Sequence, residues 1–415
     1  MTGLQKKNYS VVVIGGGPAG MAAALAASET CERVLILERN PQLGGILNQC
    51  IHDGFGLLTF QELLTGPEYA GRFEDLIGKS NITVLTGAMV IRLTPQREIL
   101  CVTRDGVLDI QAGAVVLATG CRERTRGALA IPGTRPSGIY TAGVAQHLIN
   151  IQNIKIGNTA VILGSGDIGM IMARRLTLEG MKVLCVLEKL PYCSGLPRNR
   201  FQCLNDYGIP LHLNQTVREI RGAKRVEQIV VASVDEKGDF LPGTEYTLDC
   251  DTLILSVGLI PENELARDCG IAMEPGTSGC RVSSRLETSV PGIFACGNAL
   301  HVHDLVDYVS EEGALAGRQA AVFTSRRKAP VDSVRIQAGE GVRGLTPQSA
   351  VIGETLTLSL RPAVPGIKKL LRVSAGDTFL VTKFYQRTNP AEMIRVETGI
   401  IPDGVHEIGV ELIDR

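Results

Sequence analysis

The sequence lacks an excess of charge, a long apolar run and paired cysteines. Its 42 basic and 43 acidic residues leave a formal net charge of −1, so no basic field points to nucleic acid or an anionic membrane. No apolar run approaches the roughly 20 residues that a transmembrane helix requires. The 11 cysteines are scattered without a Cys-x-x-Cys pair, which argues against a disulfide framework and provides no local zinc or iron–sulfur signature. We therefore expect no metal site, no nucleic-acid partner and no transmembrane segment.

These absences leave a globular chain of several domains. With 415 residues, 44% of them hydrophobic, it is too long for a single core and suits two or three domains. The first apolar stretch, from Val11, runs into Gly15-Gly16-Gly17, whereas a signal peptide ends in a small-residue cleavage site. We therefore expect a cytoplasmic protein.

An internal repeat is the most informative feature. Residues 11–20 form an apolar strand that runs into a glycine turn, and residues 160–169 repeat the pattern. After each turn comes a helical stretch and then a second apolar strand, which ends in Glu38 in the first copy and Glu188 in the second. This order predicts two strand–helix–strand nucleotide-binding units with parallel sheets.

Later segments complete this organisation. Apolar strands ending at glycine, residues 115–120 and 253–258, close the two units, and a third strand-to-glycine turn at 292–298 precedes a helix over about 305–324. Residues 325–330 are typical of a linker, and the strand-like patterns beyond it, at 355–361, 379–385 and 408–413, predict a small β-rich domain. We expect an FAD-binding domain in two parts, residues 1–150 and 285–325. An NAD(P)-binding domain, residues 151–284, is inserted between these parts, and a small β-rich domain follows at 326–415.

The first glycine turn has the residues that a dinucleotide pyrophosphate requires. Gly15 permits a tight turn, Gly17 lets the backbone approach a phosphate, and Gly20 lets the helix pack close to the strand. The N-terminus of the helix then offers free amides and the positive end of its dipole. Glu38 lies at the distance where an acid accepts hydrogen bonds from a ribose.

The second turn repeats this set with Gly164, Gly166 and Gly169, and Glu188 is its ribose acid. An acid at this position repels a 2′-phosphate, which favours NADH over NADPH. Lys189, the next residue, acts in the opposite direction.

Together these motifs resemble the FAD-dependent pyridine nucleotide-disulphide oxidoreductase superfamily, whose members are glutathione-reductase-like, over about residues 8–324. The resemblance implies an α/β fold with two Rossmann-like dinucleotide-binding domains, the first for FAD and the internal one for NAD(P)H, and a small β-rich domain at the C-terminus. It implies FAD contacts by Gly15, Gly17, Pro18, Ala19, Gly20, Glu38, Arg39, Gly45, Thr119, Gly120, Gly297 and Asn298. It implies NAD contacts by Gly164, Gly166, Asp167, Ile168, Gly169, Glu188 and Gly258. Asn298 replaces the acid that usually binds the flavin ribityl chain, and Ile171 replaces a glutamate that meets the nicotinamide in many relatives.

Segments in two regions of the chain narrow the resemblance. Residues 118–124, 131–133 and 141–146 resemble the flavin subunits of opine oxidases and hydrogen cyanide synthase. Residues 301–309 resemble the small flavoproteins associated with type-2 glycerol-3-phosphate and 2-hydroxyglutarate oxidase-like proteins. Both resemblances imply a subunit of a larger flavin complex. We expect a homo-oligomer or a hetero-complex.

The candidate catalytic residues are Cys50, His301 and His303. The family's disulfide enzymes have a Cys-x4-Cys pair where this chain has only Cys50, so a dithiol relay is not expected. Cys50 is then either a redox-active thiol beside the flavin or an inert core residue. His301 and His303 either transfer protons or fix the turn that carries them. Glu311 and Glu312 are expected to face solvent or a domain contact.

The expected function is electron transfer from NADH through FAD to an acceptor or a partner subunit. Two alternatives stay open: a flavin dehydrogenase or oxidase subunit that acts on an amine, imino acid or hydroxy acid, and a non-catalytic electron-transfer subunit. In the C-terminal domain we expect no cofactor site, and a docking surface for another copy or a partner.

Overall fold

The computed structural model describes residues 6–325 and 332–415. It divides into two compact units, one formed by Met1–Cys121 with Pro261–Arg415 and the other by Arg122–Ile260. Most of the predicted linker, residues 326–330, lies outside the described residues. The predicted domain boundaries at residues 150, 284 and 325 stay a prediction, because a compact unit in the structure does not show that its residues fold independently.

The central sheet of the first unit forms around β1 (Lys7–Ile14), whose Val11, Val12 and Val13 are fully buried. β1 pairs in parallel with β2 (Val34–Leu37) and with β8 (Gly106–Leu117), so that Val11 lies opposite Val34 and Ala114. An apolar run without alternation is typical of a parallel strand that is covered on both faces. The strand order is β5 (Thr83–Leu85), β2 (Val34–Leu37), β1, β8 (Gly106–Leu117), β7 (Glu98–Thr103) and β6 (Met89–Leu93), with β21 (Ile293–Ala295) also on β8.

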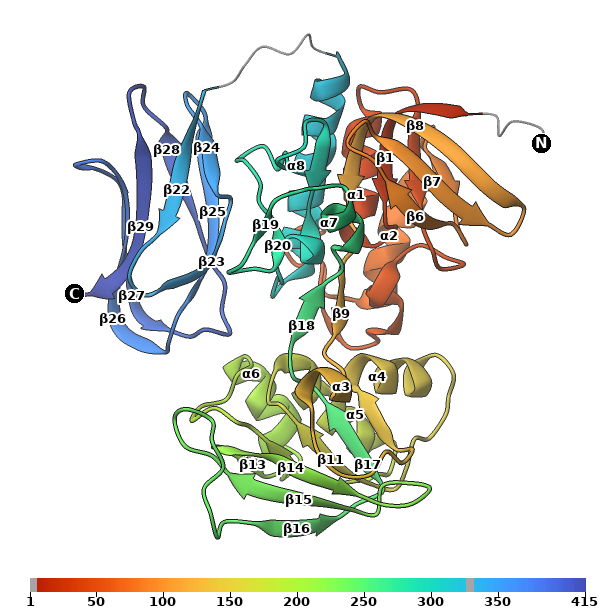
Figure 1. Ribbon diagram of the computed structural model, residues 1–415, viewed down its shortest axis with the longest axis vertical. Helices are drawn as coiled ribbons and strands as arrows, with labels where there is room; N and C mark the ends of the chain where they lie inside the picture. The colour runs from red at the N-terminus through yellow and green to blue at the C-terminus, as the bar shows by residue number, and fades with distance from the viewer. Residues whose placement is uncertain (1–5, 326–331) are drawn as a thin grey trace. The chain divides into compact units, whose positions relative to one another are not determined.

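Helices α1 (Pro18–Ser28) and α8 (Val306–Ser325) pack against each other through small residues (Figure 1). A Cβ atom added at Gly313 would lie 2.2 Å from the Ala19 carbonyl oxygen, and one at Gly317 would lie 2.0 Å from that of Ala23. The two backbones therefore approach more closely than any side chain would allow. The predicted helix at about 305–324 is confirmed as α8.

Helix α2 (Gly66–Gly78) of the same unit begins with a capping box. Thr65 is its N-cap, and the Glu68 carboxylate accepts a hydrogen bond of 2.8 Å from the Thr65 backbone amide. This pair satisfies amides that have no partner within the helix.

The second unit contains its own parallel sheet, in the order β10 (Ile139–Thr141), β17 (Thr252–Leu255), β11 (Thr159–Leu163), β12 (Lys182–Leu187) and β13 (Leu211–His212). Helices α4 (Ala142–Asn150) and α5 (Asp167–Leu178) contribute to the core on one face. An antiparallel sheet of β14 (Gln215–Arg221), β15 (Gln228–Ser233) and β16 (Tyr246–Asp249) contributes to a second core. The elements of this unit are drawn in yellow and green in Figure 1.

The C-terminal segment forms two packed sheets around a separate core (Figure 1). Strict alternation in β25 (Thr355–Pro362) buries Leu356, Leu358 and Leu360 on one face. One sheet has the order β24 (Ser349–Val351), β22 (Ser333–Ala338), β29 (Glu407–Asp414), β26 (Gly366–Ala375) and β27 (Thr378–Thr388). The other has the order β23 (Val342–Thr346), β25 and β28 (Ile394–Ile400). The predicted fold class, two Rossmann-type domains with a β-rich C-terminal region, is confirmed.

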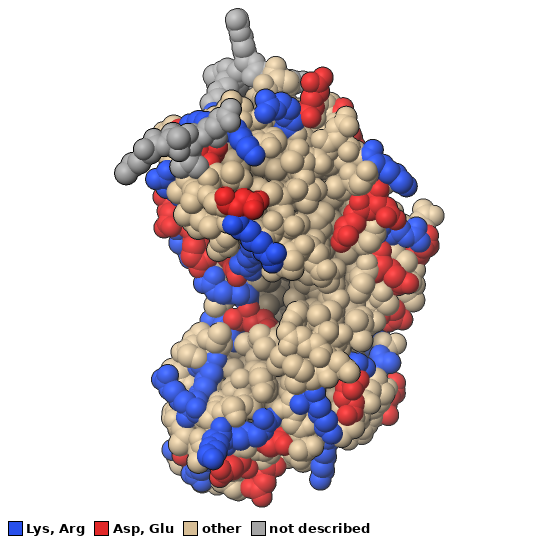
Figure 2. Space-filling view, turned by 90° about the vertical axis from the view of Figure 1, so that its right-hand side faces the viewer, with Lys and Arg blue, Asp and Glu red and all other residues tan. Residues whose placement is uncertain are grey.

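The remaining elements are short. They are β3 (Asp53–Phe55), β4 (Leu64–Thr65), β9 (Cys121–Glu123), α3 (Arg126–Leu129), α6 (Pro197–Asn199), β18 (Leu259–Pro261), α7 (Glu264–Asp268), β19 (Met273–Glu274), β20 (Gly279–Cys280) and the helical turns Gly45–Gln49, Arg200–Asn205 and Gly297–Ala299. On the face drawn in Figure 2, basic and acidic side chains are interspersed, in keeping with the balanced composition. Among the described residues, no helix is long and apolar enough to span a bilayer.

Candidate functional site

The first glycine turn combines two crowded positions with one open position. A Cβ at Gly15 would lie 2.2 Å from the Ala118 carbonyl oxygen, and one at Gly20 would lie 1.8 Å from the Gly15 carbonyl oxygen. At Gly17, by contrast, a Cβ would meet no atom within 4 Å. Gly17 is also the N-cap of α1, and no side-chain cap occupies the first amides of this helix. This open backbone cradle fits a dinucleotide pyrophosphate.

Glu38 directly follows β2, and its side chain turns back toward this cradle. It is 4% exposed, and its carboxylate accepts hydrogen bonds from the backbone amides of Gly16, at 2.6 Å, and Asn40, at 2.7 Å. Gly45 lies beside Gly17, since its added Cβ would be 3.2 Å from the Gly17 Cα. The acid, the glycine loop and the cradle therefore lie together, as a ribose next to a pyrophosphate requires.

Glu262 joins other predicted FAD residues and was missed in the sequence. Its carboxylate pairs with Arg39 at 2.8 Å, its carbonyl accepts a 2.7 Å hydrogen bond from the Thr119 hydroxyl, and its amide donates to the Gly120 carbonyl at 3.0 Å. No local pattern marks this residue, because its partners lie more than 140 positions away in the sequence.

The late turn at Gly297–Asn298 lies against α1. A Cβ at Gly297 would be 2.8 Å from the Ala19 Cβ, so this turn and the first glycine turn share one location. The Asn298 side-chain oxygen accepts a 3.1 Å hydrogen bond from the His303 backbone amide. The structure thus brings the predicted FAD residues together, and their contacts with FAD stay a prediction.

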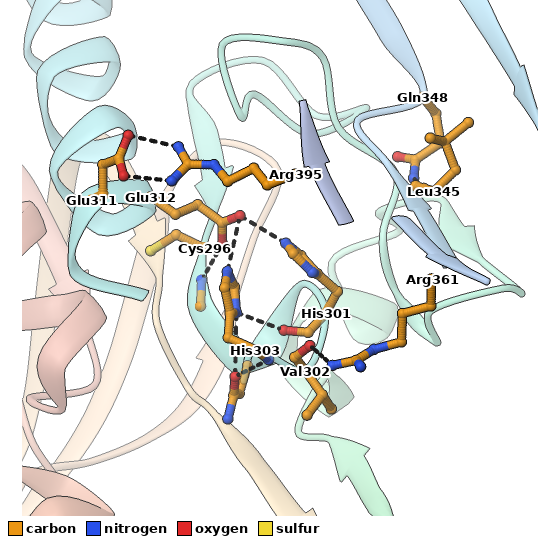
Figure 3. Close-up of polar contacts among 12 residues, drawn as sticks. Cys296, His301, Val302, His303, Glu311, Glu312, Leu345, Gln348, Arg361 and Arg395 are labelled. Carbon is orange, nitrogen blue, oxygen red and sulfur yellow. Dashed lines mark hydrogen bonds and ion pairs between the residues drawn. The ribbon is translucent and has the colours of Figure 1, made fainter. Parts of the chain in front are cut away.

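His301, His303 and Glu312 form a buried cluster beside this turn (Figure 3). Glu312 Oε2 lies 2.8 Å from His301 Nε2 and 3.5 Å from His303 Nε2, and Glu312 Oε1 accepts a 2.6 Å hydrogen bond from the Gly297 amide. The side chains of His301, His303 and Glu312 are 6%, 2% and 13% exposed. The expectation that Glu312 faces solvent or a domain contact is therefore wrong, because the turn folds back over α8 and covers it.

This burial sets the electrostatics of the cluster. Desolvation lowers the pKa of His301, and neighbouring His303 lowers it further, against the attraction of Glu312. Burial alone would raise the pKa of Glu312, but His301 and His303 more than offset this and hold it well below its usual range. The two histidines therefore stabilise the carboxylate form of Glu312.

The C-terminal domain holds the loop that carries these histidines. Arg361 of β25 donates to the Val302 carbonyl at 3.1 Å and pairs with Asp304, and the Met393 amide donates to the Asp304 carboxylate at 2.6 Å. Arg395 of β28 pairs with Glu311 at 2.5 Å, the domain contact that was expected for that acid (Figure 3). The sequence did not reveal that this domain reaches the histidine loop.

Cys50 lies at the end of the turn Gly45–Gln49. Burial raises its pKa to about 12, and its thiol donates to the Ile46 carbonyl at 3.3 Å. Only a thiolate is an effective nucleophile, so this environment favours the inert interpretation of Cys50.

The second glycine turn has the same geometry as the first. A Cβ at Gly164 would lie 1.9 Å from the Ser256 carbonyl oxygen, and one at Gly169 would lie 2.5 Å from the Gly164 carbonyl oxygen. A Cβ at Gly166, the N-cap of α5, would meet only the Ser256 hydroxyl, at 3.8 Å. Ile168 follows on the first turn of this helix. Gly258, after β17, has a φ of +96°.

Glu188 takes the place of Glu38 in this unit and is 6% exposed. Its Oε2 accepts hydrogen bonds from the Ser165 amide at 3.0 Å, the Ser165 hydroxyl at 2.6 Å and the Ser194 hydroxyl at 2.8 Å. Asp167 accepts hydrogen bonds from the Leu196 amide, at 2.8 Å, and from the Asn199 side chain, at 2.7 Å. Asp167 therefore anchors the segment 194–199.

Two open glycine cradles, each with a buried acid, define a protein that binds two dinucleotides. The family described as pyridine nucleotide-disulphide oxidoreductase matches residues 9–321, and the chain belongs to it. The protein is an FAD-dependent oxidoreductase that uses NAD(P)H. The resemblance predicted from the sequence is thereby confirmed.

Three curated relatives illustrate the range of the family. An opine oxidase subunit of Agrobacterium tumefaciens is 26% identical over 64% of this chain and 55% of its own length. Thioredoxin reductase of Listeria innocua is 27% identical over 79% of this chain and 98% of its own length. NADH oxidase of Methanocaldococcus jannaschii is 27% identical over 72% of this chain and 69% of its own length. The chain thus spans about half of the opine oxidase polypeptide.

A solved structure supports the fold. The crystal structure of T. acidophilum thioredoxin reductase aligns with a TM-score of 0.63 and 24% identity, over 76% of this chain and 98% of that one. At this identity the likeness concerns the fold alone.

Proposed function

We propose that the protein takes electrons from NADH and passes them through FAD to an acceptor or to a partner subunit. The observation that carries the proposal is the repeated cradle: in each unit an open glycine is the N-cap of a helix, and the backbone amide of the residue before it donates to a buried glutamate. When bound, FAD supplies the redox chemistry. The chain binds and orients the two dinucleotides and provides the electrostatic environment.

The residues of the first unit divide this work. The cradle at Gly15, Gly17 and Gly20 would hold the FAD pyrophosphate, and Glu38 would accept hydrogen bonds from the adenosine ribose. Asn298 would hydrogen-bond the ribityl chain, where an amide can replace the usual acid. The N-terminus of α8 would direct the positive end of its dipole toward the flavin.

The preference for NADH rests on Glu188. Its carboxylate is held by two serine hydroxyls and two backbone amides. A fixed negative charge at this position repels the 2′-phosphate of NADPH. Lys189 opposes this less than its position in the sequence suggests, because its side chain lies against Gly238, where an added Cβ would be 2.4 Å from its ammonium nitrogen.

The electron acceptor is proposed to be other than a protein disulfide. Thioredoxin reductases are among the relatives, but the short stretch that follows Gly45 has the single cysteine Cys50 in place of a Cys-x4-Cys pair, and burial raises the pKa of that thiol. The relative from Agrobacterium tumefaciens is one subunit of an opine oxidase, which instead favours a partner protein as the acceptor. The same relative supports a second candidate function, in which the flavin oxidises an amine, imino acid or hydroxy acid.

Anaerobic titration of the flavin absorbance tests the proposal. NADH is expected to bleach the flavin of the isolated protein faster than NADPH at equal concentration. Bleaching by an organic substrate but not by NADH would establish the second candidate instead. If neither donor bleaches the flavin without an added partner, the protein is an electron-transfer subunit.

A further inference from the structure

The proposed function assigns no step to His301 and His303, yet these histidines and Glu312 bring three metal-ligating atoms together. Their ligand atoms all lie within 4.8 Å of one another. They come from two segments, the loop after Asn298 and helix α8. Buried polar side chains that converge in this way need an interaction that offsets the free-energy cost of removing them from water.

The protonation pattern of His303 leaves a mismatch in this cluster. His303 Nδ1 lies 3.0 Å from the His301 carbonyl oxygen, which can only accept, so Nδ1 carries a proton. In a neutral ring, His303 Nε2 then presents a lone pair to Glu312 Oε2, 3.5 Å away, which is also an acceptor. Two acceptors that face each other in a buried site need a cation or an additional proton between them.

The nearby arginines do not supply that positive charge. Arg361 pairs with Asp304, and Arg395 pairs with Glu311. Each guanidinium therefore has its own carboxylate. The charge of Glu312 must be compensated from within the cluster.

The cluster has the dimensions of a metal site. Zinc lies about 2.0–2.2 Å from imidazole nitrogen and carboxylate oxygen, so neighbouring ligand atoms in such a site are roughly 3–3.5 Å apart. The separations of 2.8 Å and 3.5 Å from Glu312 to the two histidines are close to these values. The surrounding contacts also match: His303 donates its other nitrogen to a backbone carbonyl, and the second Glu312 oxygen accepts from the Gly297 amide.

We propose that His301, His303 and Glu312 bind one divalent first-row transition metal ion. Two imidazoles and one carboxylate suit Zn²⁺ or Fe²⁺ and leave coordination positions for water or an oxygen atom of a substrate. The site goes beyond the proposed function, because hydride transfer between NADH and FAD requires no metal. It lies beside the Gly297–Asn298 turn.

Metal content of the full-length protein tests the site directly. The protein is stripped with a chelator, incubated with Zn²⁺ or, anaerobically, Fe²⁺, desalted and analysed by mass spectrometry of the metal. About one ion per chain is expected, and X-ray absorption at the metal edge should report two imidazoles and at least one oxygen ligand. If neither Zn²⁺ nor Fe²⁺ is retained, the proposal is overturned and a proton bridges His303 and Glu312.

Matched variants localise the ion. His303→Ala and Glu312→Gln are expected to weaken metal binding at least about 100-fold, and Glu312→Gln keeps an acceptor for the Gly297 amide. Glu311→Gln and His406→Ala remove the same groups outside the cluster and should bind metal like the parent. Equal metal binding by all four variants would refute the assignment to these residues. Bleaching by NADH, measured on the same samples, keeps failure of the metal site separate from failure of the proposed function.

Discussion

The two glycine turns share their backbone geometry but differ in what surrounds their acid. In both, the first and third glycines are crowded by carbonyl oxygens, while the middle glycine faces open space. Glu38 is held by two backbone amides, whereas Glu188 is also held by the hydroxyls of Ser165 and Ser194. The glycine geometry, which the two turns share, is what any pyrophosphate needs. The hydrogen-bond partners of the acid, which differ, are where selectivity for one dinucleotide can arise.

Valine at the middle glycine of each turn, Gly17 or Gly166, should produce the largest difference between the two turns. Gly17→Val should weaken FAD binding by at least about 100-fold, because the side chain would occupy the approach of the pyrophosphate. It should still fold, since its Cβ meets no atom within 4 Å. Gly166→Val should keep its FAD and lose reduction by NADH. Flavin content and stopped-flow bleaching measure both effects.

Gly71→Val is the control for this pair, because it also adds a side chain where no atom lies within 4 Å. It should leave both dinucleotides bound. Full FAD occupancy in folded Gly17→Val protein would refute the assignment of the first turn.

Replacing the two acids should separate affinity for FAD from the preference for NADH over NADPH. Glu188→Gln removes the charge that meets a 2′-phosphate and should lower the preference for NADH over NADPH by about 10- to 100-fold. Glu38→Gln should weaken FAD binding and leave that preference unchanged. The ratio of the two bleaching rates is the readout. An unchanged ratio in Glu188→Gln would show that another group selects the nucleotide.

The serine hydroxyl near Glu188 should have a smaller effect. Ser194→Ala removes one of the three hydrogen bonds to Oε2, which corresponds to about 1 kcal/mol or roughly fivefold weaker NADH binding. Titration of the flavin protein with NADH gives the apparent affinity. An effect as large as that of Glu188→Gln would mean that the hydroxyl itself contacts the nucleotide.

The smallest change is expected from Cys50, the thiol that follows the first turn. Cys50→Ser should leave NADH-driven bleaching within about tenfold of the parent, because a thiol whose pKa is raised to about 12 stays protonated at neutral pH. Stopped-flow rates at pH 6, 7 and 8 provide the measurement. Loss of turnover together with a charge-transfer band would establish thiol chemistry.

The sequence was sufficient wherever the signal is local. The glycine spacing, the acid after the second strand and the alternation in β25 each follow from backbone geometry within about 25 residues. Glu262, Arg361 and Glu312 could not be predicted, because their roles depend on partners brought close by the fold. Glu312 in particular has an unremarkable position in the helix, and only the turn at Gly297 covers it.

The close backbone contact between α1 and α8 has a consequence for how the protein folds as it is synthesised. Gly313 and Gly317 lie directly on the backbone of α1, almost 300 residues later in the chain. The ribosome must therefore release the chain beyond Ser325 before the first helix meets its partner. Until then, the nascent N-terminal segment exposes an apolar helix face of the kind that chaperones protect. We therefore expect the flavin to be captured late in the making of this protein, although the glycine fingerprint is among the first residues translated.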